Sequence, residues 1–137
     1  MIVDSNVLID IINPVDKLAV KSANGFATAS GALSPHVNII ILAEISPGFD
    51  NPVMMNTQIA ELGLTIAPFT TDEAYRAGIA FRNYRRNGGP RTTILPDFLI
   101  GAQASVRGWP ILTRDPARFA SYFPEVELID PLEVEND

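Results

Sequence analysis

Short apolar runs alternate along this chain with longer amphipathic stretches, and polar or turn-forming residues separate them. Several of the short runs contain β-branched residues and end at Gly, Pro or Asp, which is typical of buried strands. The longer stretches have apolar residues at helical spacing and begin beside Ser, Thr, Asn or Asp, which favours capped helices. The predicted strands are 2–3, 33–37, 64–67, 111–113 and 126–129, and the predicted helices are 5–12, 15–31, 39–46, 51–62, 70–87, 98–106 and 117–122.

Strands that alternate with helices imply βα crossovers, so the pattern predicts an α/β fold with a central, mainly parallel sheet flanked by helices. The 137 residues suffice for one domain with a single core. At the start of the first helix, Ser5 or Asn6 is the expected N-cap. We expect Gly25 to interrupt the second helix.

Composition narrows the possible chemistry. The chain is 47% hydrophobic, which indicates a folded globular protein. The absence of cysteine excludes a disulfide scaffold, a thiol nucleophile and a cysteine-ligated metal site, and the single histidine, His36, excludes a multi-histidine site within one chain. No segment approaches the roughly 18 apolar residues of a membrane helix. No basic region precedes the first apolar run, so we expect a cytoplasmic protein without a secretory signal.

The positive charges are concentrated in one part of an acidic chain. The formal net charge is -6, yet all eight arginines lie within 76–118, where the only acids are Asp97 and Asp115. Because a local field steers a polyanion more than the net charge does, this segment is a candidate nucleic-acid surface. The alternative is that these arginines only solubilise exposed helix faces. The candidate RNA contacts are Arg85, Arg86, Arg91 and Arg114.

Four acids stand at positions suited to chemistry. Asp4 and Asp115 each follow a predicted strand and precede a helix, where parallel sheets gather their ligands. Asp97 lies in the first turn of a helix, and Glu44 interrupts the apolar run 39–45, where we expect it to be buried. Such oxygen ligands suit Mg²⁺ or Mn²⁺. The alternatives are that Asp4 is an ordinary turn residue, that Asp97 and Asp115 cap helices, and that Glu44 pairs with an arginine.

Four segments that contain these acids resemble, in order, the motifs of PIN-domain ribonucleases, and most closely those of VapC-type toxins. The segments are Asp4-Ser5-Asn6-Val7-Leu8-Ile9, Leu42-Ala43-Glu44-Ile45-Ser46, Pro96-Asp97-Phe98-Leu99-Ile100-Gly101-Ala102 and Leu112-Thr113-Arg114-Asp115-Pro116. The resemblance runs from residue 2 to about 131, although 13–35 matches no motif.

The resemblance implies a PIN-like domain that cuts RNA with Mg²⁺ or Mn²⁺ and a VapB-type antitoxin partner. We also expect a homodimer. By motif position, Asp4, Glu44, Asp97 and Asp115 match the catalytic, metal-binding acids. Ser5, Asn6 and Thr113 match the polar residues that support them or orient the phosphate.

Competing functions fit the residues less well. An aspartyl phosphatase needs a second aspartate two residues after the first, and position 6 is Asn. A dinucleotide-binding domain needs a glycine-rich turn after the first strand, which is missing. A PIN-like module that binds RNA or a partner without cutting stays open, although crowded carboxylates are costly without a cation. From this crowding we expect Asp97→Asn to preserve or raise the melting temperature without metal.

The other conspicuous side chains receive structural interpretations. We expect His36 to be a turn or surface histidine and Trp109 to pack over an end of the sheet, although Trp109 also suits stacking on a base. Tyr75, Phe81 and Tyr84 are predicted to be core or dimer contacts.

Overall fold

The computed structural model describes residues 1–90 and 95–135. Its centre is a five-stranded sheet in the order β3-β2-β1-β4-β5, and every neighbouring pair is parallel, which confirms the predicted α/β class. The strands are β1 (Ile2–Val3), β2 (His36–Val37), β3 (Thr65–Ile66), β4 (Ile111–Leu112) and β5 (Leu128–Ile129). Since β1 is the middle strand, Ile2 and Val3 are completely buried.

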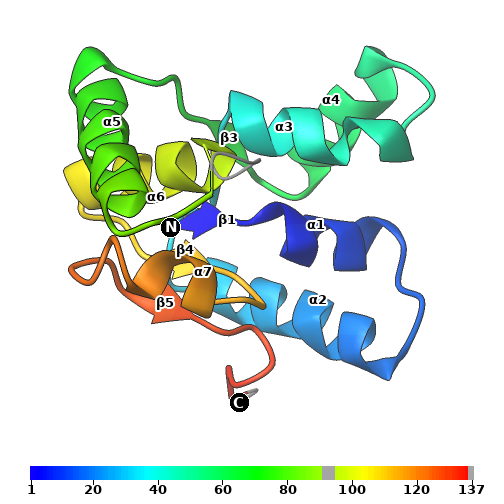
Figure 1. The fold of residues 1–137 in the computed structure, drawn as a ribbon. Coiled ribbons are helices and arrows are strands. Elements are labelled where there is room, and N and C mark those ends of the chain that lie inside the picture. The colour runs from blue at the N-terminus through cyan, green and yellow to red at the C-terminus, as the bar shows by residue number, and fades with distance from the viewer. Residues whose placement is uncertain (91–94, 136–137) are drawn as a thin grey trace.

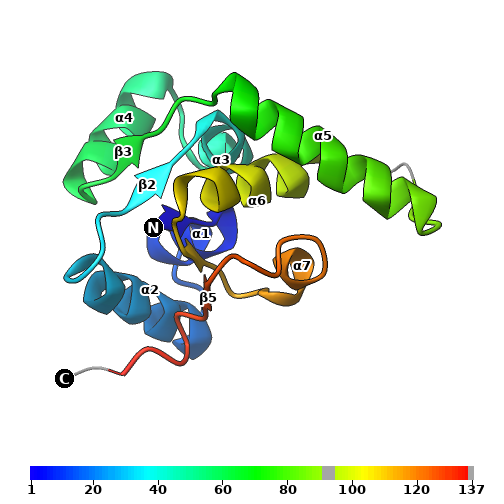
Figure 2. The ribbon, with the colours of Figure 1, turned by 90° about the vertical axis from the view of Figure 1, so that its left-hand side faces the viewer.

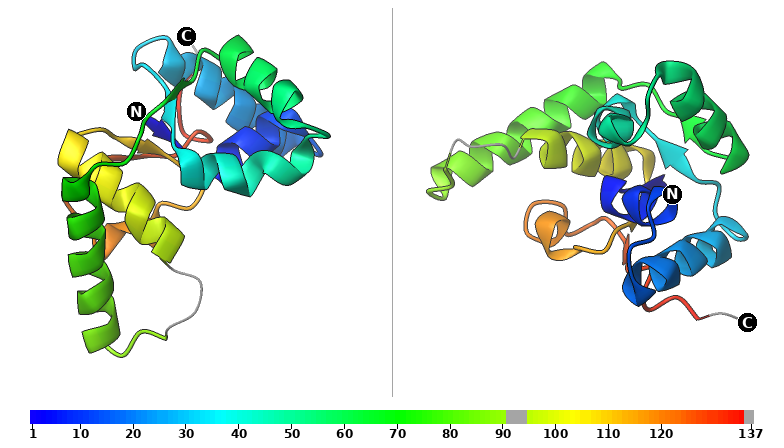
Figure 3. Two further views of the ribbon diagram at one scale, coloured as in Figure 1. Left: turned by 90° about the horizontal axis from the view of Figure 1, so that it is seen from above. Right: turned by 90° about the vertical axis from the view of Figure 1, so that its right-hand side faces the viewer.

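The helices connect these strands and surround them (Figure 1). They are α1 (Ser5–Ile12), α2 (Lys17–Ser30), α3 (Ile39–Ile45), the 3₁₀ turn η1 (Ser46–Gly48), α4 (Pro52–Glu61), α5 (Thr71–Arg86), α6 (Leu95–Arg107) and α7 (Ala117–Ala120). Helix α1 packs on α2 and α3, and α5 packs along α6. Figure 2 shows α5 reaching well beyond the strands, and the left view of Figure 3 shows α5 and α6 together at one side of the molecule.

Local sequence explains several helix starts. The side chains of Asn38 and Asn51 accept hydrogen bonds from backbone N–H groups three residues on, and so cap α3 and α4. Thr70 and Glu73 form a reciprocal capping box at the start of α5. None of the helices in the described residues is long and apolar enough to cross a membrane.

The first two helices differ from the sequence expectation. The N-cap of α1 is Asp4, whose side chain accepts from the N–H of Ser5, so neither Ser5 nor Asn6 is the cap. Helix α2 continues through Gly25 without interruption. A Cβ atom at Gly25 would lie 2.0 Å from the carbonyl oxygen of Pro131, so glycine is required there for close packing.

His36 and Trp109 stabilise each other. His36 lies in β2 and is half-buried, so it is not a turn residue. Its ring stacks on that of Trp109 with centroids 4.0 Å apart, and the guanidinium of Arg107 lies 4.9 Å from the Trp109 ring centroid. Trp109 therefore packs against β2 just before β4 begins, as predicted.

Candidate active site

Asp4 and Thr113 meet because β1 and β4 are neighbours in register. Val3 pairs with Leu112, so the next residue of each strand emerges at the same carboxyl edge of the sheet. Asp4 is completely buried, and its Oδ2 accepts from Thr113 Oγ1 at 2.8 Å. Its Oδ1 accepts from the backbone N–H of Ser5 at 2.8 Å. The carboxylate therefore has a fixed orientation.

The hydroxyl of Thr113 links three parts of this edge. Besides donating to Asp4, Oγ1 accepts from Asn6 Nδ2 at 3.4 Å and from the backbone N–H of Asp115 at 3.0 Å. Asn6 Oδ1 in turn accepts from the N–H of Arg114 at 3.3 Å. Residues of α1 and of the turn after β4 thus form one hydrogen-bonded unit around Asp4.

Asp97 joins this edge from the first turn of α6, and the guanidinium of Arg118 connects it to Asp4. Arg118 Nη1 donates to Asp4 Oδ2 at 3.0 Å, while Nε donates to Asp97 Oδ2 at 3.3 Å and Nη2 donates to Asp97 Oδ1. Burial alone would lower the pKa of Arg118, but the bond to Asp97 and the charges of Asp4, Asp97 and Asp115 raise it above its ordinary value. Arg118 is therefore a permanent cation among the acids.

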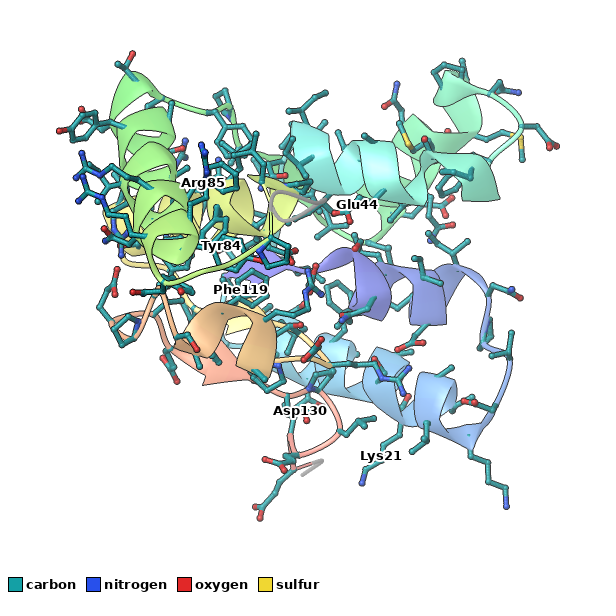
Figure 4. All side chains as sticks on the ribbon, in the orientation of Figure 1. Lys21, Glu44, Tyr84, Arg85, Phe119 and Asp130 are labelled. Carbon is teal, nitrogen blue, oxygen red and sulfur yellow. The ribbon has the colours of Figure 1, made fainter. Side chains whose placement is uncertain are left out.

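Glu44 is exposed, which contradicts the prediction that it is buried in an apolar helix. Helix α3 buries Ile41, Leu42 and Ile45 and turns Glu44 outward. In Figure 4 its carboxylate lies on the side of α3 that faces α1. Partial desolvation raises the pKa of Glu44, and the negative charges of Asp4 and Asp97 raise it further. Glu44 therefore belongs to the same electrostatic site, which it borders from the solvent side.

Asp115 is also exposed, in the turn between β4 and α7. Its charge acts on Arg118. The fold thus brings all four predicted acids to one edge of the sheet, with Asp4 at the base and Asp115 and Glu44 at the rim. No three acidic or histidine side chains in 1–90 and 95–135 are close enough to form a ready-made metal cage.

The candidate RNA-binding arginines differ in their surroundings. Arg85 and Arg86 are exposed in the last turn of α5. Arg114 instead has a structural partner, since its Nη1 donates to both carboxylate oxygens of buried Asp10 at 3.0 and 3.1 Å. Arg91 lies outside the described residues.

A cavity of about 210 Å³ opens beside Asp97 and Arg118. Its other walls are largely aromatic and come from Tyr84, Phe98, Tyr122 and Phe123. A second hollow of about 530 Å³ runs along α5 past Arg86 and shares Tyr122 with the first. The two hollows therefore link the acidic site to the basic end of α5, where Figure 4 shows Tyr84 and Arg85.

The three aromatic residues predicted as core or dimer contacts separate into two groups. Phe81 and Tyr84 pack on Phe98, with ring centroids 5.7 and 5.4 Å apart. Tyr75 is 73% exposed and lies apart from this cluster, so it is not a core residue.

Sequence reasoning missed Arg118 and Asp10. Arg118 resembles any arginine on a short helix, and only the fold shows that one turn of α7 places it over Asp4 and Asp97. Asp10 is an acid in an apolar helix, the same signal that singled out Glu44, and it is the one that is buried.

Comparison with known proteins supports the fold. No protein-family model matches the sequence, and a search of curated proteins finds no match. Solved structures do match over nearly the whole chain. A chain of VapBC2 from Rickettsia felis, bound to a DNA fragment from their promoter, is 16% identical with a TM-score of 0.70 and covers 93% of this chain and 95% of that one.

Two further solved structures have a similar fold. A chain of DNA-bound VapBC from Salmonella typhimurium is 18% identical with a TM-score of 0.70, covering 95% of this chain and 96% of that one. A chain of FitAcB from Neisseria gonorrhoeae is 19% identical with a TM-score of 0.67, covering 96% and 98%. The protein thus has the PIN-like α/β fold that its motifs predict.

Proposed function

We propose that this protein is a divalent-metal-dependent endoribonuclease that acts as the toxin of a toxin–antitoxin pair. The observation that supports this most is the convergence of Asp4, Glu44, Asp97 and Asp115 at the carboxyl edge of a PIN-like sheet. These acids belong to motifs that lie far apart in the sequence and that follow the order of the motifs in the PIN-domain ribonucleases that they resemble.

The donor set fits Mg²⁺ or Mn²⁺. Both ions prefer hard oxygen ligands, and Mg²⁺ needs only one or two carboxylates because it keeps several waters. Asp4 and Asp97 would hold the ion directly, with Glu44 and Asp115 binding its waters. The two ion pairs of Arg118 support this assignment, since they stabilise a cation between Asp4 and Asp97.

A bound divalent ion supplies a nucleophilic water and neutralises charge on the phosphate. The chain's own residues supply orientation and proton transfer. Thr113 and the N–H of Ser5 hold the Asp4 carboxylate in place, while Asn6 fixes the turn that carries Asp115. Glu44 borders the site from the solvent side, where its carboxylate is placed to accept a proton from a water at the site.

The surface beside the acids suits an unpaired RNA strand. In the aromatic cavity next to Asp97, the partly exposed rings of Tyr84 and Tyr122 suit stacking with a base, and the exposed Arg85 and Arg86 lie farther along α5. Phosphate contacts at these arginines would hold the strand across the site.

Incubation of the purified protein with single-stranded and structured RNAs tests the ribonuclease proposal. We expect cleavage in Mg²⁺ or Mn²⁺, none in excess chelator, and recovery when metal is restored. RNA binding without cleavage under any metal condition would instead favour a catalytically silent PIN-like module.

The toxin role rests on the motif resemblance and on the fold shared with VapBC and FitAB complexes. Expression of the chain alone in a bacterial host should arrest growth, and co-expression with a VapB-type antitoxin should restore it. The resemblance implies that a segment of the antitoxin covers the acidic site with a basic side chain in place of the metal, so we expect the complex to bind metal poorly. Harmless expression would contradict the toxin role and leave the nuclease proposal standing.

A further inference from the structure

The guanidinium of Arg118 lies between Asp4 and Asp97, where the proposed function requires a divalent metal ion. This inference therefore rests on the proposed function. Its guanidinium donates three hydrogen bonds to two carboxylates that belong to different elements, Asp4 after β1 and Asp97 in α6. It also interacts electrostatically with Asp115 and Glu44. One side chain therefore carries the positive charge that all four acids share.

The position of Arg118 offsets the electrostatic repulsion among the acids of the site. Carboxylates held together at one site repel one another, and the folded chain offsets this with a cation or with protons. Asp4 is completely buried, so its charge is the most costly to leave unpaired. Arg118 pairs it at 3.0 Å.

We propose that Arg118 is a built-in counter-ion that a divalent ion must displace from Asp4 and Asp97. The guanidinium thereby offsets part of the negative charge of the metal-free site, and the ion binds only by competing with it. Intrinsic affinity for metal is lowered by that competition, so the site fills only when the divalent ion is abundant enough to replace Arg118.

The surroundings of Arg118 allow this exchange. Its side chain is 27% exposed and that of Asp97 is 25% exposed, so both are reached from solvent. Asp4 keeps its bonds from Thr113 and Ser5 after Arg118 leaves, and its carboxylate therefore stays oriented. The guanidinium also lies 5.0 Å from the Phe119 ring centroid, a contact that involves no acid of the site.

Arg76 provides a matched control. It pairs with the carboxylate of Glu125 at 2.8 Å and lies 4.6 Å from the Phe123 ring centroid, so it combines an ion pair with an aromatic contact as Arg118 does. It has a similar exposure of 28%, and its ion pair involves none of the four acids.

The test is titration of the metal-free protein with Mn²⁺, followed by calorimetry and by the electron paramagnetic resonance signal of free Mn²⁺. We expect Arg118→Gln to bind Mn²⁺ about tenfold more tightly than the wild type, which corresponds to about 1.4 kcal/mol. Arg76→Gln should bind like the wild type. Arg118→Lys keeps the charge but loses the planar fork, so it should show a smaller gain.

The outcomes separate the inference from the function on which it rests. If wild type binds Mn²⁺ and the Arg118 variants bind it equally or more weakly, Arg118 is not a competitor and the inference is overturned. If no form binds Mn²⁺, both the inference and the metal-dependent function fail. Should Arg118→Gln not fold, Arg118→Lys decides, because unchanged or weaker binding in that variant also overturns the inference.

Discussion

Thr113 Oγ1 donates a 2.8 Å hydrogen bond to Asp4 Oδ2, although 109 residues separate the two in sequence. The bond exists because β1 and β4 are adjacent and in register, so it reports directly on the carboxyl edge of the sheet. It also places a neutral donor against the one acid of the site that is completely buried.

Replacing Thr113 should therefore affect both folding and metal binding. Thr113→Val keeps the shape but leaves Asp4 without this donor, so we expect a loss of about 1–3 kcal/mol in the free energy of unfolding. Metal affinity should fall about tenfold or more, since Asp4 is no longer held in place. Thr113→Ser retains the hydroxyl and should resemble wild type. Denaturant melts and Mn²⁺ titration check this, and equal behaviour of the two variants would contradict the role of the bond.

Arg85 and Arg86 should contribute to the salt dependence of RNA binding. Each phosphate contact to a single strand contributes a slope of about 0.7 in log K against log salt, so replacing both with Gln should flatten the slope by about 1.4. The matched control replaces Lys17 and Lys21, which are exposed on α2. Figure 4 shows Lys21 far from Arg85. An equal flattening in both double variants would mean that the effect is not local to α5.

Glu73 should make the stability depend on pH. Burial alone would raise its pKa, but hydrogen bonds from Arg107 and Thr70 outweigh this and lower it below the ordinary value of 4.5. A carboxyl whose pKa is lower in the folded state stabilises the fold above the unfolded-state value and loses that contribution as pH falls through the folded-state value.

Glu73→Gln should therefore cost about 1–2 kcal/mol at pH 7. The difference from wild type should shrink as the pH falls below 4.5. Thermal melts between pH 3 and pH 7 measure this, with Asp72→Asn as the exposed neighbouring control. A difference that is constant with pH would rule out the ionised carboxylate as its source.

Asp97→Asn should lower the melting temperature of the metal-free protein. Repulsion among the carboxylates alone would leave this melting temperature unchanged or raise it. Arg118 already offsets part of that repulsion. Removing the charge of Asp97 therefore breaks its ion pair with Arg118. We expect a cost of about 1 kcal/mol, because both side chains are partly exposed. The rise in melting temperature on adding Mg²⁺ should shrink, and differential scanning fluorimetry would show both effects. A metal-free melting temperature above that of wild type would contradict the pairing.

Local patterns were enough to predict the order of strands and helices and the parallel sheet, because each element has its own apolar run and breaker. They did not predict tertiary adjustments at the ends of elements. The N-cap of α1 is Asp4 rather than Ser5 or Asn6, because Asp4 follows β1 directly and its side chain accepts from the N–H of Ser5. Gly25 looked like a helix breaker, but the structure uses it for close contact with Pro131.

The residues of the site also divide into those that local sequence predicts and those that depend on tertiary contacts. Asp4, Asp97 and Asp115 stand at the ends of elements, and such positions can be read from one motif at a time. Burial of Glu44 was predicted wrongly because an apolar run does not say which face of the helix meets the core. Arg118 became visible only when α7 was placed beside α6 and β1, since its role depends on partners 21 and 114 residues away.

The most direct test is single-turnover cleavage of single-stranded RNA by wild type, Asp97→Asn and Asp72→Asn, in Mg²⁺ and in excess chelator. Asp72 is the matched control because it also lies in the first turn of a helix, at the start of α5. We predict that wild type and Asp72→Asn cut only with metal, and that Asp97→Asn cuts at least about a hundredfold more slowly. Cleavage that survives chelation, or equal rates for Asp97→Asn and wild type, would contradict a metal-dependent ribonuclease site at this edge of the sheet.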